Sequence, residues 1–369
     1  MRKWRAKSAV IVAVSALALA ACSSDNEEAN GDGGTDGGSS GLSGTLDGVG
    51  ASSQQAAQEA WVVGFNGTNP DVQINYSPDG SGAGREQFAA GGSDFGATDS
   101  YLTDDEGELS AATERCTDVV EVPLYVSPIA VVFNLENVDS LNLQPATIAQ
   151  IFNQEITNWN DPAIAEDNPD VDLPDQAITP VNRSDESGTT ENFVEYLSIT
   201  APDDWTHEVS GDWPVSGGES AQGTSGVVSA VEGAQGTIGY VDASQAGDLG
   251  TAAIGVGEEF VEYSPEAAAA VLEVSERVEG RGEHDFAYDL ARDTTEAGVY
   301  PIVLVSYGLA CTTYDDADTG ELVREYFSYI ISEEGQATSA DRAGSAPISD
   351  ELRQQIQPAV DAIGTGSGS

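Results

Sequence analysis

The segment around Arg183 carries residue types that can hold a small anion. Arg183 is the only lysine or arginine between Arg115 and Arg277, and Ser-Gly-Thr follows it at positions 187–189. A guanidinium offers planar donors, hydroxyls add more, and the first N–H groups of a helix have no partner inside the helix. Because an apolar pattern at helical spacing follows, the segment predicts an oxyanion-binding turn at the start of a helix.

Three further turns share this mixture of glycine and hydroxyl residues. They are Gly48–Gln54, Gly80–Gly84 and Phe95–Ser100. The first two stand where a strand-like segment gives way to a helix-like one. Glycine there permits close approach of the backbone, and serine can both donate to an anion and cap a helix. Each turn alone is weak evidence, because Ser-Gly sequences most often form ordinary turns; together the four turns indicate one shared site.

The charge of the chain excludes one large class of partners. It has 13 basic and 63 acidic residues, for a formal charge of −50. Four of the basic residues precede position 22, so the remainder has 9 basic residues, no lysine and a balance of −54. Nucleic acid is therefore not expected as a partner, because binding it needs basic surface that neutralises phosphates. An anion would have to be held by local donors rather than by the overall field.

The N-terminus predicts export and lipid anchoring. A basic start precedes an apolar run, Ala9–Ala21, that is too short for an ordinary membrane span. The run leads into Leu-Ala-Ala-Cys, which resembles a bacterial lipobox whose cysteine, here Cys22, is lipidated. We expect a signal peptide at 1–21 and a flexible acidic tether at 22–44, which is polar and glycine-rich. The protein would then be extracytoplasmic and anchored to the cell membrane; the alternative is an ordinary signal peptide with an incidental cysteine.

Two cysteines, Cys116 and Cys311, remain after Cys22. Export permits a disulfide, and an even count without CxxC spacing argues against zinc. We expect the two to pair, and the alternative is two buried free thiols. Closing so long a loop would stabilise the fold by roughly 5 kcal/mol in the chain-entropy estimate, although strain often reduces the gain.

Strand-like and helix-like segments alternate along the body of the chain, which predicts an α/β architecture. About 320 residues follow the tether, enough for two lobes of ordinary size. The expected strands are Val72–Tyr76, Val119–Leu135, Gly236–Val241 and Tyr300–Tyr307. The expected helices include Ala146–Phe152, Phe193–Leu197 and the amphipathic Leu322–Ile331.

Taken in this order, the turns resemble the substrate-binding protein of the bacterial phosphate ABC importer (PstS type), over most of residues 45–350. The matching positions, one turn after another, are Ser52 and Ser53, then Ser81, then Asp99, then Arg183, Ser187, Gly188 and Thr189. The Arg183–Thr189 and Phe95–Asp99 motifs are specific in combination. The chain departs from the family pattern in one place: an aromatic residue and a proline commonly follow the first hydroxyl, whereas Ser53 and Gln54 stand here.

The resemblance implies a two-lobed, type II periplasmic-binding-protein-like fold with hinge strands between the lobes. Lobe 1 would hold residues 45–124 and 301–360, lobe 2 would hold 125–300, and 361–369 would be a disordered tail. The crossings would lie near Val122–Pro128 and Val299–Val303. The implied function is to bind inorganic phosphate in the cleft and deliver it to membrane-embedded ABC permease subunits, with no reaction, no cofactor and no metal.

The resemblance also gives each residue a role that its chemistry can perform. Phosphate at neutral pH keeps a proton, so a selective site needs an acceptor as well as many donors. The acceptor would be Asp99, since a carboxylate has no proton to give. Fully ionised sulfate would face an unpaired, repelling carboxylate, and a buried polar group without a partner costs about 1–3 kcal/mol or more. Asp185, two residues from Arg183, would hold the guanidinium in position without contacting the ligand itself.

Three other functions are weighed against this one. A binding protein for sulfate, molybdate or tungstate is disfavoured by Asp99. A secreted phosphatase with a serine nucleophile lacks support, because no GxSxG elbow stands between a strand-like and a helix-like segment, and neither His207 nor His284 has metal-ligand spacing to another histidine. A sensor or adhesin that keeps the fold without transport is left open by the sequence.

Overall fold

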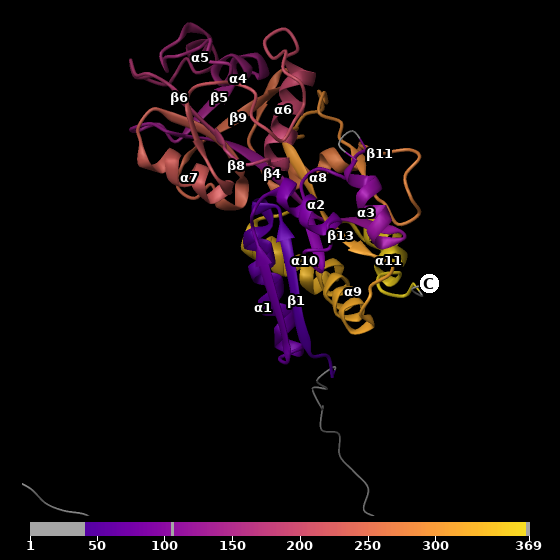
Figure 1. The fold of residues 1–369 in the computed structure, drawn as a ribbon. Coiled ribbons are helices and arrows are strands. Elements are labelled where there is room, and N and C mark those ends of the chain that lie inside the picture. The colour runs from indigo at the N-terminus through magenta and orange to yellow at the C-terminus, as the bar shows by residue number, and fades with distance from the viewer. Residues whose placement is uncertain (1–40, 105–106, 367–369) are drawn as a thin grey trace, which may run out of the picture. The chain divides into compact units, whose positions relative to one another are not determined.

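The computed structural model describes residues 41–104 and 107–366 (Figure 1). The predicted signal peptide, Cys22 and most of the predicted tether lie outside these residues. Within them, regular structure begins at Gly44, one residue earlier than predicted, and Leu42 already packs against the core. Over the same residues, no helix is both long enough and apolar enough to cross a membrane.

Eleven strands of the described chain form one mixed sheet, β1 (Gly44–Gly50), β2 (Val72–Ser77), β3 (Phe95–Thr98), β4 (Val119–Asn134), β5 (Ser140–Leu143), β6 (Thr179–Arg183), β7 (Glu219–Ala221), β8 (Thr237–Asp242), β9 (Gly250–Val256), β10 (Glu259–Val261) and β13 (Val303–Cys311). The main path runs β2-β1-β3-β13-β4-β8-β6-β7, and β9 pairs with β4, β5 and β10. A separate two-stranded ladder joins β11 (Glu276–Arg277) to β12 (Tyr288–Asp289).

Helices occupy the connections between these strands. The α-helices are α1 (Gln55–Thr68), α2 (Ser81–Ala89), α3 (Glu108–Cys116), α4 (Pro145–Phe152), α5 (Pro162–Asp167), α6 (Gly188–Thr200), α7 (Gly223–Gly233), α8 (Pro265–Glu273), α9 (Ala317–Ile331), α10 (Glu333–Ala343) and α11 (Asp350–Asp361). Two 3-10 turns are η1 (Ser52–Gln54) and η2 (Ala243–Gln245). The predicted α/β architecture is confirmed.

Strand β4 is shared by the two lobes. Its first part pairs antiparallel with β13 as far as Pro128, and its second part pairs with β8 from Ile129 onward. Proline has no N–H to give to a ladder, and Pro128 stands at the position where the strand changes partner. Figure 1 shows β1, α1 and α9–α11 gathered at one end of this strand and α4–α7 with β5–β9 at the other. This is the two-lobed, type II arrangement that the sequence predicted.

The predicted elements are found with small shifts at their ends. The expected strand Val119–Leu135 is β4, and all 16 of its residues except Asn134 are buried. Helix α9 buries the six apolar residues of its predicted face, Leu322, Val323, Tyr326, Phe327, Ile330 and Ile331. Pro145 at the first position of α4 suits that helix start, because the missing N–H would have had no partner there.

The cysteine prediction is confirmed, and the prediction for the C-terminal tail is partly wrong. Cys116 at the end of α3 is bonded to Cys311 at the end of β13. Residues 361–366, which we expected to be disordered, belong to the folded structure. Helix α11 continues to Asp361, and Ile363 is fully buried. The N–H of Gly364 donates to the carbonyl of Cys311 at 3.2 Å, so this segment is hydrogen-bonded to the end of β13 that carries the disulfide.

Candidate functional site

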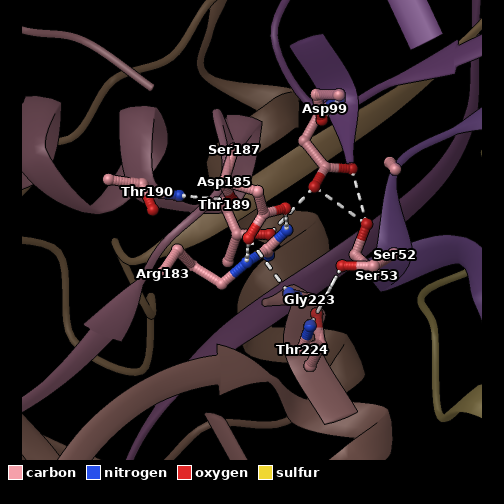
Figure 2. A network of polar contacts seen from close by, with 12 residues as sticks. Ser52, Ser53, Asp99, Arg183, Asp185, Ser187, Thr189, Thr190, Gly223 and Thr224 are labelled. Carbon is pink, nitrogen blue, oxygen red and sulfur yellow. Dashed lines mark hydrogen bonds and ion pairs between the residues drawn. The ribbon is translucent and has the colours of Figure 1, made fainter. Parts of the chain in front are cut away.

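The four predicted turns come together in the fold, three of them at the starts of helices. Figure 2 shows residues of three of these turns, among them Ser53, Asp99 and Thr189, around the Asp99 carboxylate. Ser52 opens η1, Ser81 opens α2, Gly188 opens α6, and Asp99 follows directly after β3. The predicted side chains are all at most 4% exposed, namely Ser52, Ser53, Ser81, Asp99, Arg183, Ser187 and Thr189. The N-termini of α2 and α6 bring to one buried polar cluster N–H groups that have no partner inside their helices, together with partial positive charge.

Asp99 is the centre of this cluster. Its Oδ1 accepts the hydroxyls of Ser53 at 2.7 Å and Ser306 at 2.6 Å. Its Oδ2 accepts the hydroxyls of Ser53 at 2.8 Å and Thr189 at 3.0 Å. Burial raises the pKa of Asp99, and the hydrogen bonds from Ser306, Ser53 and Thr189 offset only part of that rise. The structure thus contains a buried acceptor surrounded by hydroxyl donors.

Three other predicted serines accept backbone N–H groups with their hydroxyl oxygens. Ser81 Oγ accepts the N–H of Asp99 at 3.1 Å, and Ser187 Oγ accepts that of Thr190 at 3.2 Å. Ser52 Oγ accepts the N–H of Thr224 at 3.1 Å and also contacts its hydroxyl at 3.1 Å. Since a hydroxyl donates and accepts at once, the hydrogens of Ser81 and Ser187 can still be given to a bound anion.

Arg183 is held by Asp185, as the sequence predicted. The Arg183 Nε donates to Asp185 Oδ1 at 2.8 Å, and Nη2 donates to Oδ2. Burial opposes ionisation of Asp185, but the hydrogen bonds and charge of Arg183 outweigh it, so the pKa of Asp185 is lowered. Asp185 Oδ1 also accepts the N–H of Gly223 at the start of α7, at 3.0 Å. The guanidinium is therefore oriented and partly neutralised by a carboxylate that is itself held on a helix start.

Glycine is needed at Gly188 because of close contact between the lobes. A Cβ at this position would lie 2.7 Å from the Asp99 Cβ and 2.7 Å from the Ser81 Oγ. Real Cβ atoms do not approach other atoms so closely, so any larger residue would push α6 away from the other two segments. Glycine is also needed at Gly80, because its φ is +108° and a Cβ there would lie 2.7 Å from Asp185 Oδ2.

Comparison with known proteins identifies the family. A PBP superfamily domain matches residues 35–334. Phosphate-binding protein PstS 3 of Mycobacterium leprae is 35% identical over 359 residues, which cover 94% of this chain and 95% of that protein. The chain belongs to the PstS family. PstS 2 of Mycobacterium tuberculosis is 33% identical, with 98% of this chain and 100% of that protein covered.

Solved structures agree with this PstS assignment at the level of the fold. A high-affinity periplasmic phosphate-binding protein solved with phosphate at pH 8.5 has a TM-score of 0.70 at 20% identity, covering 85% of this chain and 93% of that one. A phosphate-binding protein from Stenotrophomonas maltophilia has a TM-score of 0.66 at 18% identity, covering 86% and 94%. PstS proteins are solute-binding proteins, and the two-lobed fold is the one that the sequence resemblance implied.

The departure from the PstS pattern at Ser53 and Gln54 has a structural counterpart. Ser53 gives its hydroxyl to both oxygens of Asp99. Gln54 Nε2 donates to Ser306 Oγ at 2.7 Å, and Gln54 Oε1 accepts the amide of Gln58 at 2.8 Å. The two polar residues therefore extend the hydrogen-bond network around Asp99 from η1 into α1 and β13.

Ser306 and Thr224 are hydroxyl residues of this PstS network that sequence reasoning missed. Ser306 is a single hydroxyl inside the apolar strand β13, next to the register shift between Ser306 and Tyr307, and nothing local marks it. Thr224 belongs to a run, Gly223–Gly226, with the same glycine and hydroxyl pattern as the predicted turns. That signal was present and could have identified it as a fifth turn.

The two histidines lie apart from this cluster in surface contacts. His207 Nε2 contacts Asn153 Oδ1 at 3.1 Å, and His284 Nδ1 contacts Asp118 Oδ2 at 2.8 Å. In the part of the chain that the structure describes, no group of three or more histidine, cysteine, aspartate or glutamate side chains could hold a metal ion.

Proposed function

We propose that this PstS family member binds inorganic phosphate between its lobes and delivers it to the subunits of an ABC permease. The observation that carries the proposal is the buried carboxylate of Asp99, which accepts hydroxyls from both lobes. Such an acceptor suits an anion that still carries a proton, while the surrounding donors suit its oxygens. The names of the PstS relatives support the same ligand.

The ligand would take donors from each of the predicted turns. These are the hydroxyls or backbone N–H groups of Ser52, Ser53, Ser81, Ser187, Gly188 and Thr189, with the guanidinium of Arg183. Asp185 would act behind Arg183 without touching the ligand. Because Arg183 is paired with Asp185 and the exported chain has a balance of −54, hydrogen-bond dipoles would hold phosphate more than net charge would.

The two lobes would close around the ligand. We place lobe 1 at 45–124 and 301–360 and lobe 2 at 125–300, with crossings near Val122–Pro128 and Val299–Val303. Only the closed form lets the donors of both lobes reach one anion, so binding favours closure. We further propose that the protein works outside the cytoplasm, with Cys22 lipidated and residues 22–44 linking the folded body to the membrane. No catalysed reaction is proposed.

Calorimetric titration with phosphate and with sulfate tests this function. We expect tight phosphate binding and little competition from excess sulfate. Arg183→Ala should weaken phosphate binding by about 30-fold or more, because it removes a charged donor to the anion and leaves the partly buried carboxylate of Asp185 without its partner. Arg342→Ala is the matched control, since it removes the same charge from a side chain that is 65% exposed. Equal affinity for sulfate, or an unchanged affinity in Arg183→Ala, would overturn the proposal.

A further inference from the structure

Asn192 connects the backbone of two site residues. It lies on α6, four residues after Gly188, and is 6% exposed. Its Nδ2 donates to the carbonyl of Asp99 at 2.8 Å and to the carbonyl of Gly188 at 2.8 Å. Both amide hydrogens of Asn192 are therefore used. They connect the backbone of Asp99 to the first turn of α6.

The direction of the Asn192 amide is set by Arg292. Arg292 Nη2 donates to the Oδ1 of Asn192. An arginine has donors only, so the amide oxygen must face it and the NH2 group must face the two carbonyls. If the amide were reversed, its oxygen would face the carbonyl oxygens of Asp99 and Gly188, and its NH2 group would face a guanidinium.

Arg292 is itself fixed from two directions. It is 1% exposed, its Nε donates to Glu195 Oε2 at 2.6 Å, and its Nη1 donates to the carbonyl of Val303 at 3.0 Å. Glu195 lies on α6 and Val303 is the first residue of β13. The Arg292 guanidinium therefore connects the start of β13, in lobe 1, to α6, whose N-terminus lies at the site.

We propose that Arg292 and Asn192 form a positioning pair that holds Asp99 and Gly188 at the spacing needed to bind the anion. The proposal rests on the proposed phosphate function and extends it to two residues outside the predicted site. Arg292 acts through Asn192 and not by its charge. A direct electrostatic action is the alternative to be tested, because Arg292, Asn192 and Asp99 line one cavity of about 340 Å³.

Calorimetric titration of the full chain with inorganic phosphate tests the pair through Asn192→Ala, Arg292→Met and the double variant. Each single variant should weaken binding by about 10-fold or more, since each leaves buried polar groups unpaired. The double variant should bind about as well as the weaker single variant, because residues acting through one chain of hydrogen bonds are not additive. Losses that multiply in the double variant would overturn the proposal.

Two further measurements separate positioning from charge and from folding. The salt dependence of the phosphate affinity should be the same in Arg292→Met as in the unaltered protein, whereas a direct charge effect would make it shallower. Arg292→Lys, which keeps a donor for Asn192, should recover part of the affinity. Asn75→Ala, at an exposed position, and Arg342→Met are the matched controls and should bind normally.

The outcome distinguishes this proposal from the phosphate function itself. If the unaltered protein does not bind phosphate, the proposed function fails before the variants are compared. If the unaltered protein binds but Asn192→Ala and Arg292→Met bind equally well in the folded state, the positioning role is wrong and the phosphate function stands. A lower Tm with unchanged affinity would likewise show that the pair only stabilises the fold.

Discussion

Thr189 donates its hydroxyl to Oδ2 of Asp99 at 3.0 Å, so the first turn of α6 is bonded directly to the residue after β3. Asp99 belongs to the lobe that contains β1–β3, and Thr189 belongs to the lobe that contains β6–β8. The acceptor expected to select the anion is thus also a contact that joins the two lobes. Selectivity and closure should therefore change together when this pair is altered.

Asp99→Asn should reduce the preference for phosphate over sulfate. A buried carboxylate rejects an anion that has no proton to give, and we expect the unaltered protein to prefer phosphate by roughly 100-fold or more. An asparagine can turn an NH2 group toward a sulfate oxygen, so the ratio of the two affinities should fall by about 10-fold or more. Calorimetric titration with both anions measures this ratio.

The pH dependence of sulfate binding gives a second test of Asp99. Burial raises the pKa of its carboxyl. As the pH falls toward that raised pKa, Asp99 gains a proton and becomes a donor, so sulfate binding to the unaltered protein should strengthen. The Asp99→Asn variant has no such proton to gain and should show a flatter pH profile. Parallel profiles for the two proteins would contradict the assigned role.

Gly188→Ala should separate binding from stability. The added Cβ would lie 2.7 Å from both Asp99 Cβ and Ser81 Oγ, so the closed arrangement must open slightly. Gly188 is the first residue of α6 and its φ is not positive, so alanine adds no backbone strain there. We expect phosphate affinity to fall by about 10-fold or more while Tm changes little.

Gly233→Ala is the matched control for Gly188→Ala. It also lies in a helix, and a Cβ there would have no heavy atom within 4 Å. Affinity should be unchanged in this variant. If Gly188→Ala binds phosphate as tightly as Gly233→Ala does, the close contact at Gly188 is not required for binding.

The parts of the site that the sequence predicted are those governed by local rules. Glycine and hydroxyl residues at a change from strand to helix mark a helix start, and Ser52, Ser81 and Ser187 were found in this way. The two-lobed fold followed from alternating strands and helices together with the family resemblance. These features depend on residues close together in the chain, where backbone conformation and capping decide the outcome.

The parts that the sequence did not predict depend on pairing between distant segments. Ser306 reaches Asp99 only because β13 lies beside β3, 207 residues away in the chain. Asn192 lies in a helix and Arg292 in a loop, and neither is marked by its neighbours in the sequence. Their contact spans 100 residues and exists only in the folded protein. No periodicity or local motif reports such contacts, because they are set by the order of strands in the sheet.

Removing the disulfide should lower stability and leave phosphate binding unchanged. The Cys116–Cys311 bond spans 195 residues, and the chain-entropy estimate for such a loop is roughly 5 kcal/mol, with smaller values common in practice. Cys116→Ser with Cys311→Ser should therefore reduce the free energy of unfolding by about 2–5 kcal/mol in urea titration. The bond lies between the ends of α3 and β13, away from the residues that bond Asp99. A large loss of affinity in the folded variant would show that this bond also shapes the site.

The last prediction concerns Asp242, a fully buried carboxyl at the end of β8. Its Oδ1 accepts the N–H of Ser244 at 3.0 Å, and both oxygens contact the hydroxyl of Tyr125 at 3.1 Å. Burial raises the pKa of Asp242 to about 7, in spite of the hydrogen bonds from Ser244 and Ser127. The folded protein therefore keeps this proton over a range of pH in which an unfolded chain has lost it.

The direction of the stability change follows from that difference. An aspartate in an unfolded chain ionises near pH 4. Between about pH 4 and 7 the unfolded state has lost the proton and the folded state holds it, so the free energy of unfolding should fall as the pH rises. The fall is at most about 4 kcal/mol, complete near pH 7 and constant above it. Asp242→Asn cannot ionise, so its stability relative to the unaltered protein should increase across this window, as measured by urea titration from pH 4.5 to 8. A difference between the two proteins that stays constant with pH would mean that Asp242 ionises normally, and the burial argument would be wrong.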